Sequence, residues 1–278
     1  MNFLETVVQE KKVLVGKKKK RMSPGDLISR TDEQTKKNVF YDSFAQPLQD
    51  DIRIIAEIKR ASPSRGTSKN AGVDLSRIIS AYESGGARAL SVLTERLHFN
   101  GSLDDLKLAK KLTTLPILRK DFIVDAYELY EAKAFGADAV LLISEALDST
   151  QIDEFVATAF SIGLDVLLEV HSVASYEKIE HVKGTLTGVN SRNLETLAID
   201  LHRAREVVRI IPRERPVIIE SGIFNRSDIE LFLDDGVSGF LVGSLLMNSG
   251  DPAEVLRKLI HPGHANLQPA SRIPEHRS

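Results

Sequence analysis

The sequence predicts an α/β protein, a single (β/α)8 TIM barrel with an extra N-terminal helical segment. After the first fifty residues, eight short apolar runs recur, and amphipathic stretches separate them. Eight strand–helix units are typical of a closed barrel, and 278 residues suit one domain of that kind. The predicted strands are 53–60, 89–94, 115–120, 139–144, 165–170, 186–190, 216–221 and 239–244.

An open, doubly wound sheet is the alternative arrangement of alternating strands and helices. Such a sheet usually has fewer strands and a glycine-rich turn after the first one. The first strand here is followed by Ser62-Pro63-Ser64-Arg65-Gly66, which lacks the G-x-G-x-x-G pattern. The sequence therefore favours the closed barrel.

Glycines and polar cap residues mark the predicted helix boundaries. Glycine tolerates the left-handed backbone conformation that often ends a helix. Asp and Asn side chains can accept the unpaired amide hydrogens of a first helical turn. The predicted ends are Gly86, Gly136, Gly163 and Gly236, and the predicted N-terminal caps are Asp74, Asp125 and Asn225.

The chain divides into three predicted parts. Residues 1–50 are expected to form a helical extension packed on the barrel, and residues 51–260 form the catalytic barrel. Residues 261–278 carry few apolar side chains, so we expect a disordered tail. The basic run Lys17–Arg21 could bind nucleic acid or a membrane, but a solvated helix end is the favoured interpretation.

Composition argues against several classes of protein. The 37 basic and 39 acidic residues give a net charge of −2, so no overall charge indicates a nucleic-acid partner. The absence of cysteine excludes a disulfide framework and a thiolate metal site. The N-terminus lacks the pattern of a signal peptide, and no apolar run approaches the roughly 20 residues of a membrane span. We therefore expect a cytoplasmic protein with no nucleic-acid and no membrane partner.

Polar side chains stand at the C-terminal ends of five predicted strands, where barrels carry their active sites. Because strand side chains alternate, Lys120 should point inward with Leu118, two positions earlier. Edge charges neutralised by neighbours are the alternative interpretation. Buried charge is costly unless it is paired or used, and six converging polar residues favour function. The predicted catalytic residues are Glu57, Lys59, Lys120, Glu169, Asn190 and Glu220.

These residue types can perform acid–base chemistry without a cofactor. A lysine can protonate a carbonyl or hydroxyl oxygen, and burial or a second lysine can lower its pKa. A glutamate can remove a proton. His98, His171 and His181 lack the spacing of metal ligands, so we expect no metal.

The last two predicted strands each end in a glycine beside a hydroxyl. Ser221-Gly222 follows one strand and Gly243-Ser244 follows the other. Glycine lets backbone amides approach a phosphate closely, and barrels often bind phosphate at this place. Ordinary strand–helix turns are the alternative, and we predict a phosphate site.

A series of motifs runs in order across residues 50–260. They are AEIKRASPS (56–64), SVLTE (91–95), FNGS (99–102), LRKDFIVD (118–125), LLEVH (167–171), GVNSRNLETL (188–197), ESGI (220–223) and LVGSLLM (241–247). Together they resemble the indole-3-glycerol-phosphate synthase family. The resemblance implies a barrel enzyme of tryptophan biosynthesis that closes the pyrrole ring of indole. The implied substrate is 1-(2-carboxyphenylamino)-1-deoxyribulose 5-phosphate, and the implied products are indole-3-glycerol phosphate, carbon dioxide and water.

The resemblance also implies roles for the acids and bases. Lys120 matches the general acid that polarises the ketone during ring closure, and Glu169 matches the acid or base of the later dehydration. Lys59 matches the lysine that holds the anthranilate carboxylate. Glu57 matches a carboxylate that assists proton transfer.

Further positions match substrate contacts of the family. Asn190 and Glu220 match residues that position hydroxyl groups and the ring nitrogen. Phe99 and Phe122 match aromatic walls of the anthranilate pocket, although core packing is an alternative for both. Arg192 lies in a family motif and is expected to support the site electrostatically. The positions that match the phosphate cradle are Ser62, Ser221, Gly222, Gly243 and Ser244.

Two places depart from the family pattern. The loop after the first strand reads LysAsnAlaGlyValAspLeu (69–75), where the family usually has an aromatic residue. This departure puts in doubt whether the loop closes over substrate in the familiar way. Leu245 stands where the family often has a small residue, but the backbone amides expected to bind phosphate are unaffected.

Two other functions compete with this one. Another phosphate-binding barrel enzyme, such as phosphoribosylanthranilate isomerase, needs one acid–base pair and would leave the second lysine unused. A non-catalytic binding barrel is expected to have lost at least one of Glu57, Lys59, Lys120 or Glu169, and all four are present. The expected partners are the phosphorylated substrate and, as separate chains, other enzymes of the tryptophan pathway.

Overall fold

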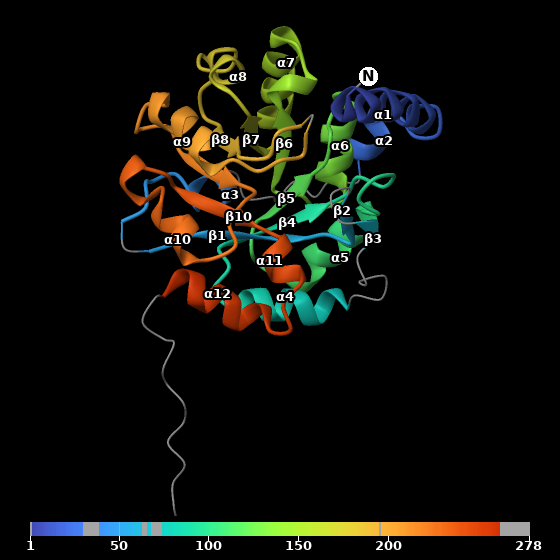
Figure 1. Cartoon of the computed structure of the whole chain (residues 1–278). Helices are drawn as coiled ribbons and strands as arrows, with labels where there is room; N and C mark the ends of the chain where they lie inside the picture. Colours follow the sequence, from blue (N-terminus) through green and yellow to red (C-terminus); the bar gives the residue numbers. More distant parts are fainter. Residues whose placement is uncertain are drawn as a thin grey trace, which may run out of the picture.

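The computed structural model describes residues 2–29, 39–49, 51–62, 66–67, 74–194 and 196–261. Eight parallel strands form a closed barrel in the order β1-β4-β5-β6-β7-β8-β9-β10, and β10 pairs with β1 to close it (Figure 1). The barrel strands are β1 Ile54–Ile58, β4 Ala89–Leu93, β5 Ile117–Lys120, β6 Ala139–Ile143, β7 Asp165–Val170, β8 Leu186–Asn190, β9 Val217–Glu220 and β10 Gly239–Val242. Each lies within one of the eight predicted runs, so the predicted fold class is confirmed.

Helices surround this barrel and precede it (Figure 1). The amphipathic stretch between β9 and β10 is not one continuous helix, because it divides into a short α-helix and a separate 3-10 turn. A hairpin of β2 Ala61–Ser62 and β3 Gly66–Thr67 stands apart from the barrel. The helices are α1 Phe3–Lys19, α2 Pro24–Ile28, α3 Val39–Asp42, α4 Leu75–Ser84, α5 Leu103–Leu112, α6 Tyr127–Ala134, η1 Ser144–Ala146, α7 Ser149–Ser161, α8 Val173–Glu177, α9 Leu201–Ile210, α10 Arg226–Glu230, η2 Leu233–Asp235, α11 Ser244–Met247 and α12 Pro252–Ile260.

Most of the predicted helix boundaries are confirmed. The four glycines predicted at helix ends all have positive φ, between 68° and 91°. Asp74 and Asn225 accept backbone amide hydrogens as the caps of α4 and α10. Asp125 is not the cap of α6, because Ala126 holds that position, but its carboxylate accepts the N–H of Tyr127 at 2.9 Å.

Alternation along the strands separates two apolar layers. One core cluster fills the inside of the barrel and includes Ile55, Leu118, Leu167 and Ile218. The other lies between the strands and the surrounding helices and includes Ile54, which neighbours Ile55 along β1. The inward direction inferred for Leu118 is therefore correct, and it fixes the direction of the polar residues two positions later.

The N-terminal helix α1 is joined to the barrel by buried charges. Lys11 Nζ lies 2.8 Å from Asp121 Oδ1 and 2.6 Å from Glu128 Oε1. Arg119, which is fully buried, places Nη2 3.0 Å from both Asp121 and Glu131. Burial alone would lower the pKa of Lys11, but the carboxylates of Asp121 and Glu128 raise it above its ordinary value. The lysine is therefore held charged in an apolar environment.

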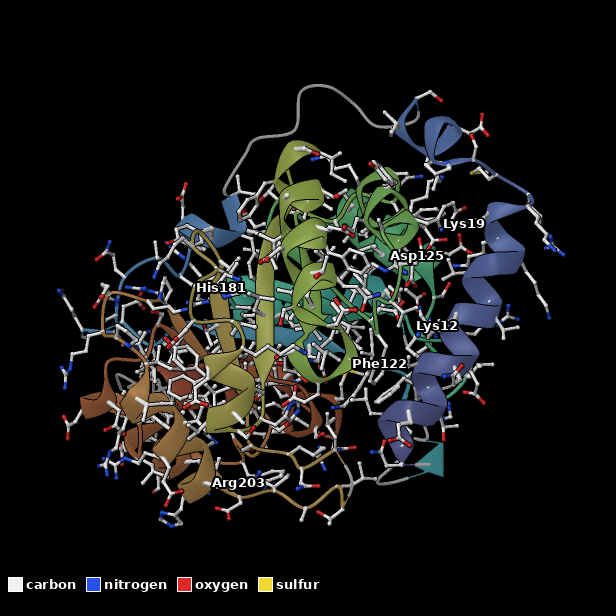
Figure 2. All side chains as sticks on the ribbon, turned by 90° about the horizontal axis from the view of Figure 1, so that it is seen from above. Lys12, Lys19, Phe122, Asp125, His181 and Arg203 are labelled. Carbon is white, nitrogen blue, oxygen red and sulfur yellow. The ribbon has the colours of Figure 1, made fainter. Side chains whose placement is uncertain are left out.

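The basic run Lys17–Arg21 is not only a solvated helix end. Lys18 Nζ lies 2.7 Å from Glu131, and Lys19 Nζ lies 2.6 Å from Asp125 (Figure 2). The run therefore attaches the end of α1 to α6 and to the turn before it. No helix of the described residues is both long and apolar enough to span a membrane.

Several predictions fall outside the described residues. The tail 262–278 and most of the loop 69–75 lie there, as does the side chain of Ser62. The departure noted in that loop therefore stays an inference from the sequence.

We expect Lys11→Met to destabilise the fold by about 3–5 kcal/mol, because it leaves buried carboxylates without their cation. The neighbouring Lys12 is exposed (Figure 2), and Lys12→Met should change stability by less than about 0.5 kcal/mol. Urea unfolding of the two variants measures the difference. Equal stability of the two would mean that the buried pairs contribute nothing.

Candidate active site

One pocket opens at the C-terminal ends of the barrel strands. Thirteen of the fourteen residues predicted from the sequence line it, and the side chain of the fourteenth, Ser62, lies outside the described residues. The pocket residues are Phe3, Glu57, Lys59, Leu93, Phe99, Lys120, Asp121, Phe122, Leu141, Ile143, Glu169, Asn190, Arg192, Leu194, Leu197, Glu220, Ser221, Gly222, Ile223, Phe224, Leu241, Val242, Gly243 and Ser244. The barrel thus brings together side chains from positions more than 180 residues apart in the sequence.

Lys120 is held between two carboxylates. Its Nζ lies 3.1 Å from Glu169 Oε2 and 2.5 Å from Glu220 Oε2. The two glutamate side chains are at most 3% exposed. Gly188 leaves the necessary space, because a Cβ at this position would strike Glu220 Oε1. The ammonium group is therefore fixed at the bottom of the pocket.

A second ion pair stands beside the first. Lys59 Nζ lies 2.7 Å from Glu57 Oε1. Glu57 also packs against Gly243, where an added Cβ would strike its carboxylate. A larger residue at Gly243 would therefore displace Glu57 as well as fill the predicted phosphate site, so such a change cannot isolate phosphate binding.

The charges of the site shift one another's pKa values. Burial alone would lower the pKa of Lys120, but Glu169, Glu220 and Glu57 raise it above its ordinary value. The expectation that burial and a second lysine lower the pKa of such a lysine is therefore wrong here, because the carboxylates outweigh both. Lys120 is an ammonium ion at neutral pH and can act as an acid.

The three carboxylates differ in protonation. Burial would raise the pKa of both Glu57 and Glu169, but the neighbouring lysines lower it below its ordinary range. Burial raises the pKa of Glu220 to about 8, with Lys120 opposing the rise and Glu169 adding to it. Glu220 can therefore carry a proton near neutral pH while Glu169 stays ionised. This division suits acid and base steps in one pocket.

Aromatic side chains form one wall of the pocket. The ring centroids of Phe99 and Phe122 lie 6.2 Å apart, and that of Phe3 lies 6.3 Å from Phe122. Phe3 was missed in the sequence, since nothing in the motif of α1 separates it from a core residue. Glu95 holds the turn before Phe99, because its carboxylate accepts three successive backbone N–H groups.

The predicted phosphate turns lie at the same pocket. Ser221 has φ 64° and Gly222 has φ 79°. The left-handed conformation is strained for serine, with a cost of about 1–3 kcal/mol, and such strain is concentrated at ligand sites. Gly243 and Ser244 follow the neighbouring strand β10, where Gly243 is the N-cap and Ser244 the first residue of α11. The two turns stand next to each other because β9 and β10 are paired.

The loop after β8 also faces the pocket. Asn190 Oδ1 accepts the backbone N–H of Arg192 at 3.0 Å, and Arg192 Nη1 donates to the carbonyl of Leu197 at 2.9 Å. Leu197 has φ 60° and lines the pocket. Arg192 thus braces this loop, beyond the electrostatic support expected of it.

His171 is a neighbour of the site that sequence reasoning missed. Its Nε2 lies 3.2 Å from Glu169 Oε1, and its Nδ1 lies 3.1 Å from Glu145 Oε2. Burial would lower its pKa, but these two carboxylates raise it to about 10. The signal was available, because His171 stands two positions after Glu169 and shares its direction. Among the described residues, no group of three His, Cys, Asp or Glu side chains is arranged to hold a metal.

The raised pKa of His171 predicts how stability depends on pH. Its contribution is complete below the unfolded pKa of about 6.5 and is lost as the pH rises through about 10. The unfolding free energy of the wild type relative to His171→Asn should therefore fall steadily between these values, as measured by urea unfolding. His181→Asn removes a half-exposed histidine paired with Asp153 and should give a smaller difference. A difference that grows with pH would contradict the charged state of His171.

Solved structures that resemble the fold include the 3-hexulose-6-phosphate synthase of Salmonella typhimurium, with TM-score 0.60, 15% identity and coverage of 75% of this chain and 96% of that one. The N-acetylmannosamine-6-phosphate 2-epimerase of Clostridium perfringens has TM-score 0.56 and 14% identity, and covers 82% of this chain and 97% of its own. These likenesses show the barrel fold alone.

Sequence comparison is more specific than these structural likenesses, because it identifies a family. An indole-3-glycerol phosphate synthase of Polynucleobacter necessarius subsp. necessarius (strain STIR1) is 36% identical over 264 residues, which are 93% of this chain and 98% of that one. The family model for indole-3-glycerol phosphate synthase matches residues 4–259, so its match includes α1 as well as the barrel. The chain belongs to the indole-3-glycerol phosphate synthase family.

Proposed function

We propose that this protein is a carboxy-lyase of tryptophan biosynthesis that converts 1-(2-carboxyphenylamino)-1-deoxyribulose 5-phosphate into indole-3-glycerol phosphate, carbon dioxide and water. Family membership supports the pathway. The observation that carries the reaction is the charged Lys120 between Glu169 and Glu220, with a separate Lys59–Glu57 pair beside it. Isomerisation by phosphoribosylanthranilate isomerase chemistry needs one acid–base pair, and family membership does not favour it.

Binding orients the two ends of the substrate. We assign the phosphate to the turns at Ser221-Gly222 and Gly243-Ser244, where backbone amides can approach it. The anthranilate ring packs against Phe99 and Phe122, and Lys59 holds its carboxylate. This orientation brings the ring carbon that carries the carboxylate toward the ketone, next to Lys120.

Ring closure needs an acid at the ketone. The ring carbon attacks the carbonyl carbon, and the carbonyl electron pair takes a proton from Lys120 Nζ to form a hydroxyl group. The bond to the carboxylate then breaks, carbon dioxide leaves, and its electron pair restores the aromatic ring. Glu57, which pairs with Lys59, assists the accompanying proton transfer.

Dehydration completes the indole. The new hydroxyl group leaves as water after it accepts a proton, and the ring loses a proton to form the double bond of the pyrrole. We assign these transfers to Glu169, with Asn190 and Glu220 holding the hydroxyl groups and the ring nitrogen. The division of charge among the carboxylates supports these roles.

The proposal needs no metal or cofactor, because acids and bases of the chain supply every step. Phosphorylated substrate is the proposed small-molecule partner, with other enzymes of the pathway as separate chains. Absence of nucleic-acid and membrane partners, and a cytoplasmic location, stay predictions from the sequence.

The direct test is an assay of the purified protein with the carboxyphenylamino-deoxyribulose phosphate. Indole fluorescence should rise with turnover, and one carbon dioxide should be released for each indole formed. The absence of both products would contradict the proposed function.

Replacement of the two lysines by methionine should change kcat and KM in different ways. Lys120→Met should lower kcat by about 10²–10⁴-fold with little change in substrate binding, because its proton is transferred only during ring closure. Lys59→Met should damage KM as well as kcat, because it removes a contact to the bound carboxylate. Steady-state and single-turnover kinetics separate the two patterns. A kcat within a few-fold of wild type for Lys120→Met would make Lys59 the leading candidate for the acid.

A substitution at Ser244 tests the phosphate site without adding a Cβ. It therefore avoids the clash with Glu57 that a substitution at Gly243 would cause. Ser244→Asp places a negative charge beside the phosphate and should raise KM by about 10- to 100-fold. Ser244→Asn has a similar size and no charge, so it should raise KM far less. Similar KM values for the two variants would place the phosphate elsewhere.

A further inference from the structure

The proposed reaction consumes one proton in each turnover. The substrate enters with an ionised carboxylate, and that group leaves as neutral carbon dioxide. The phosphate keeps its charge, and the dehydration step both takes and releases a proton. One proton must therefore reach Lys120 from solvent before the next cycle, although its partner carboxylates are buried and its own side chain is only 15% exposed.

A second cavity lies next to the substrate pocket, and Leu194 lines both. It occupies about 550 Å³ and is bounded by α1, η1, the start of α8, the loop after β8 and α9. That is room for many water molecules, since each takes about 30 Å³ of liquid. The exposed side chains of Glu5, Gln9 and Arg203 stand at its rim (Figure 2 labels Arg203), so it opens to solvent.

His171 connects the two spaces. Its side chain is 8% exposed and lines the second cavity, while Glu169 lines the substrate pocket. Only 3.2 Å separates His171 Nε2 from Glu169 Oε1, and the other oxygen of Glu169 lies 3.1 Å from Lys120 Nζ. Nδ1 of the same ring lies 3.1 Å from Glu145, which also lines the cavity.

The backbone fixes the ring in this position. The N–H of His171 donates to Glu145 Oε1 at 3.1 Å and to Ser175 Oγ at 3.0 Å. The charged groups near the ring are Glu169 on β7 and Glu145 on η1, and Glu5 and Arg203 also line the cavity. Glu145 and Glu169 lie 3.1 and 3.2 Å from the two ring nitrogens, and a ring between two carboxylates is suited to pass protons between them once Nε2–H aligns with Glu169.

We propose that His171, backed by Glu145, is a proton shuttle that recharges Lys120 through Glu169 from the solvent of the second cavity. The inference rests on the proposed function, since it supplies the proton that the proposed reaction consumes. It gives a role to a histidine that the steps of ring closure and dehydration do not use.

Recharging Lys120 takes three proton transfers. After Lys120 has given up its proton, its charge no longer lowers the pKa of Glu169. The N–H bond at Nε2 of the imidazolium then breaks, and an O–H bond forms at Glu169, which leaves a neutral imidazole. A half-turn of the carboxyl group exchanges its two oxygens, and the carboxylic acid gives its proton to the neutral amine of Lys120. Water in the second cavity then returns a proton to the imidazole. The net result is one proton moved from solvent to Lys120, with no electron transferred.

The test is His171→Asn, compared with His181→Asn as a control of the same chemical change. His181 is half exposed, pairs with Asp153 and lines neither cavity (Figure 2). In His171→Asn the first turnover should proceed with the proton already on Lys120, and later turnovers should wait for its return. Rapid-mixing kinetics should therefore show a burst of one indole per enzyme, followed by a steady state about tenfold slower, with KM little changed.

Added imidazole distinguishes a shuttle from a structural role. A small proton carrier that enters the second cavity should restore most of the lost kcat in His171→Asn and should leave His181→Asn unaffected. Glu145→Gln keeps the ring but removes its outer carboxylate, and it should show the same burst with a smaller loss. This second variant keeps the test decisive if His171→Asn does not fold.

Two results would overturn the shuttle. One is a steady state within twofold of wild type without a burst. The other is a loss that is equally large in the first turnover and is not restored by imidazole, as expected if His171 only positions Glu169. An inactive wild-type protein would instead contradict the proposed function itself, so the two failures are distinguishable.

Discussion

The structure depends on the rule that buried charge must be paired, and Lys120 is where the rule acts most strongly. Glu169 and Glu220 hold its ammonium group from two other strands, at 3.1 and 2.5 Å. Buried ions without partners would cost several kcal/mol each. The pairing fixes the geometry of the pocket and also sets its chemistry, because it keeps Lys120 charged and leaves Glu220 able to hold a proton.

Because side chains alternate in direction along β5, this strand contributes charged residues to two separate networks of ion pairs. Lys120 points into the barrel, whereas its neighbour Arg119 points outward and reaches Asp121 and Glu131. Asp121 in turn receives Lys11 from α1. The N-terminal helix is therefore joined to the strand that carries the central lysine, and the same helix contributes Phe3 to the pocket wall. The extension is part of the site's construction rather than an addition to its surface.

Local patterns in the sequence were sufficient to predict much of the site. They could not predict interactions between residues that lie far apart in the sequence. Leu118 predicted the direction of Lys120 because alternation is a property of one strand. The direction of the pKa shift of Lys120 could not be read in this way, since it depends on carboxylates 49 and 100 residues away. Phe3 and the partners of Lys18 and Lys19 were missed for the same reason. The position of His171 near the site could have been predicted from its place two residues after Glu169. From the sequence, it was considered only as a metal ligand.

The sequence by itself determined the eight strands, the helix ends at its glycines, and the residues that reach the pocket, because periodicity, backbone freedom and strand direction are local. Its motifs also indicated the family that comparison then showed. Only the tertiary structure decided which charges meet, since barrel closure sets distances between strands that no spacing in the sequence encodes. It placed Glu57 against Gly243 and His171 between two cavities. Pairing across strands, and with it the protonation of the site, is a property of the closed barrel.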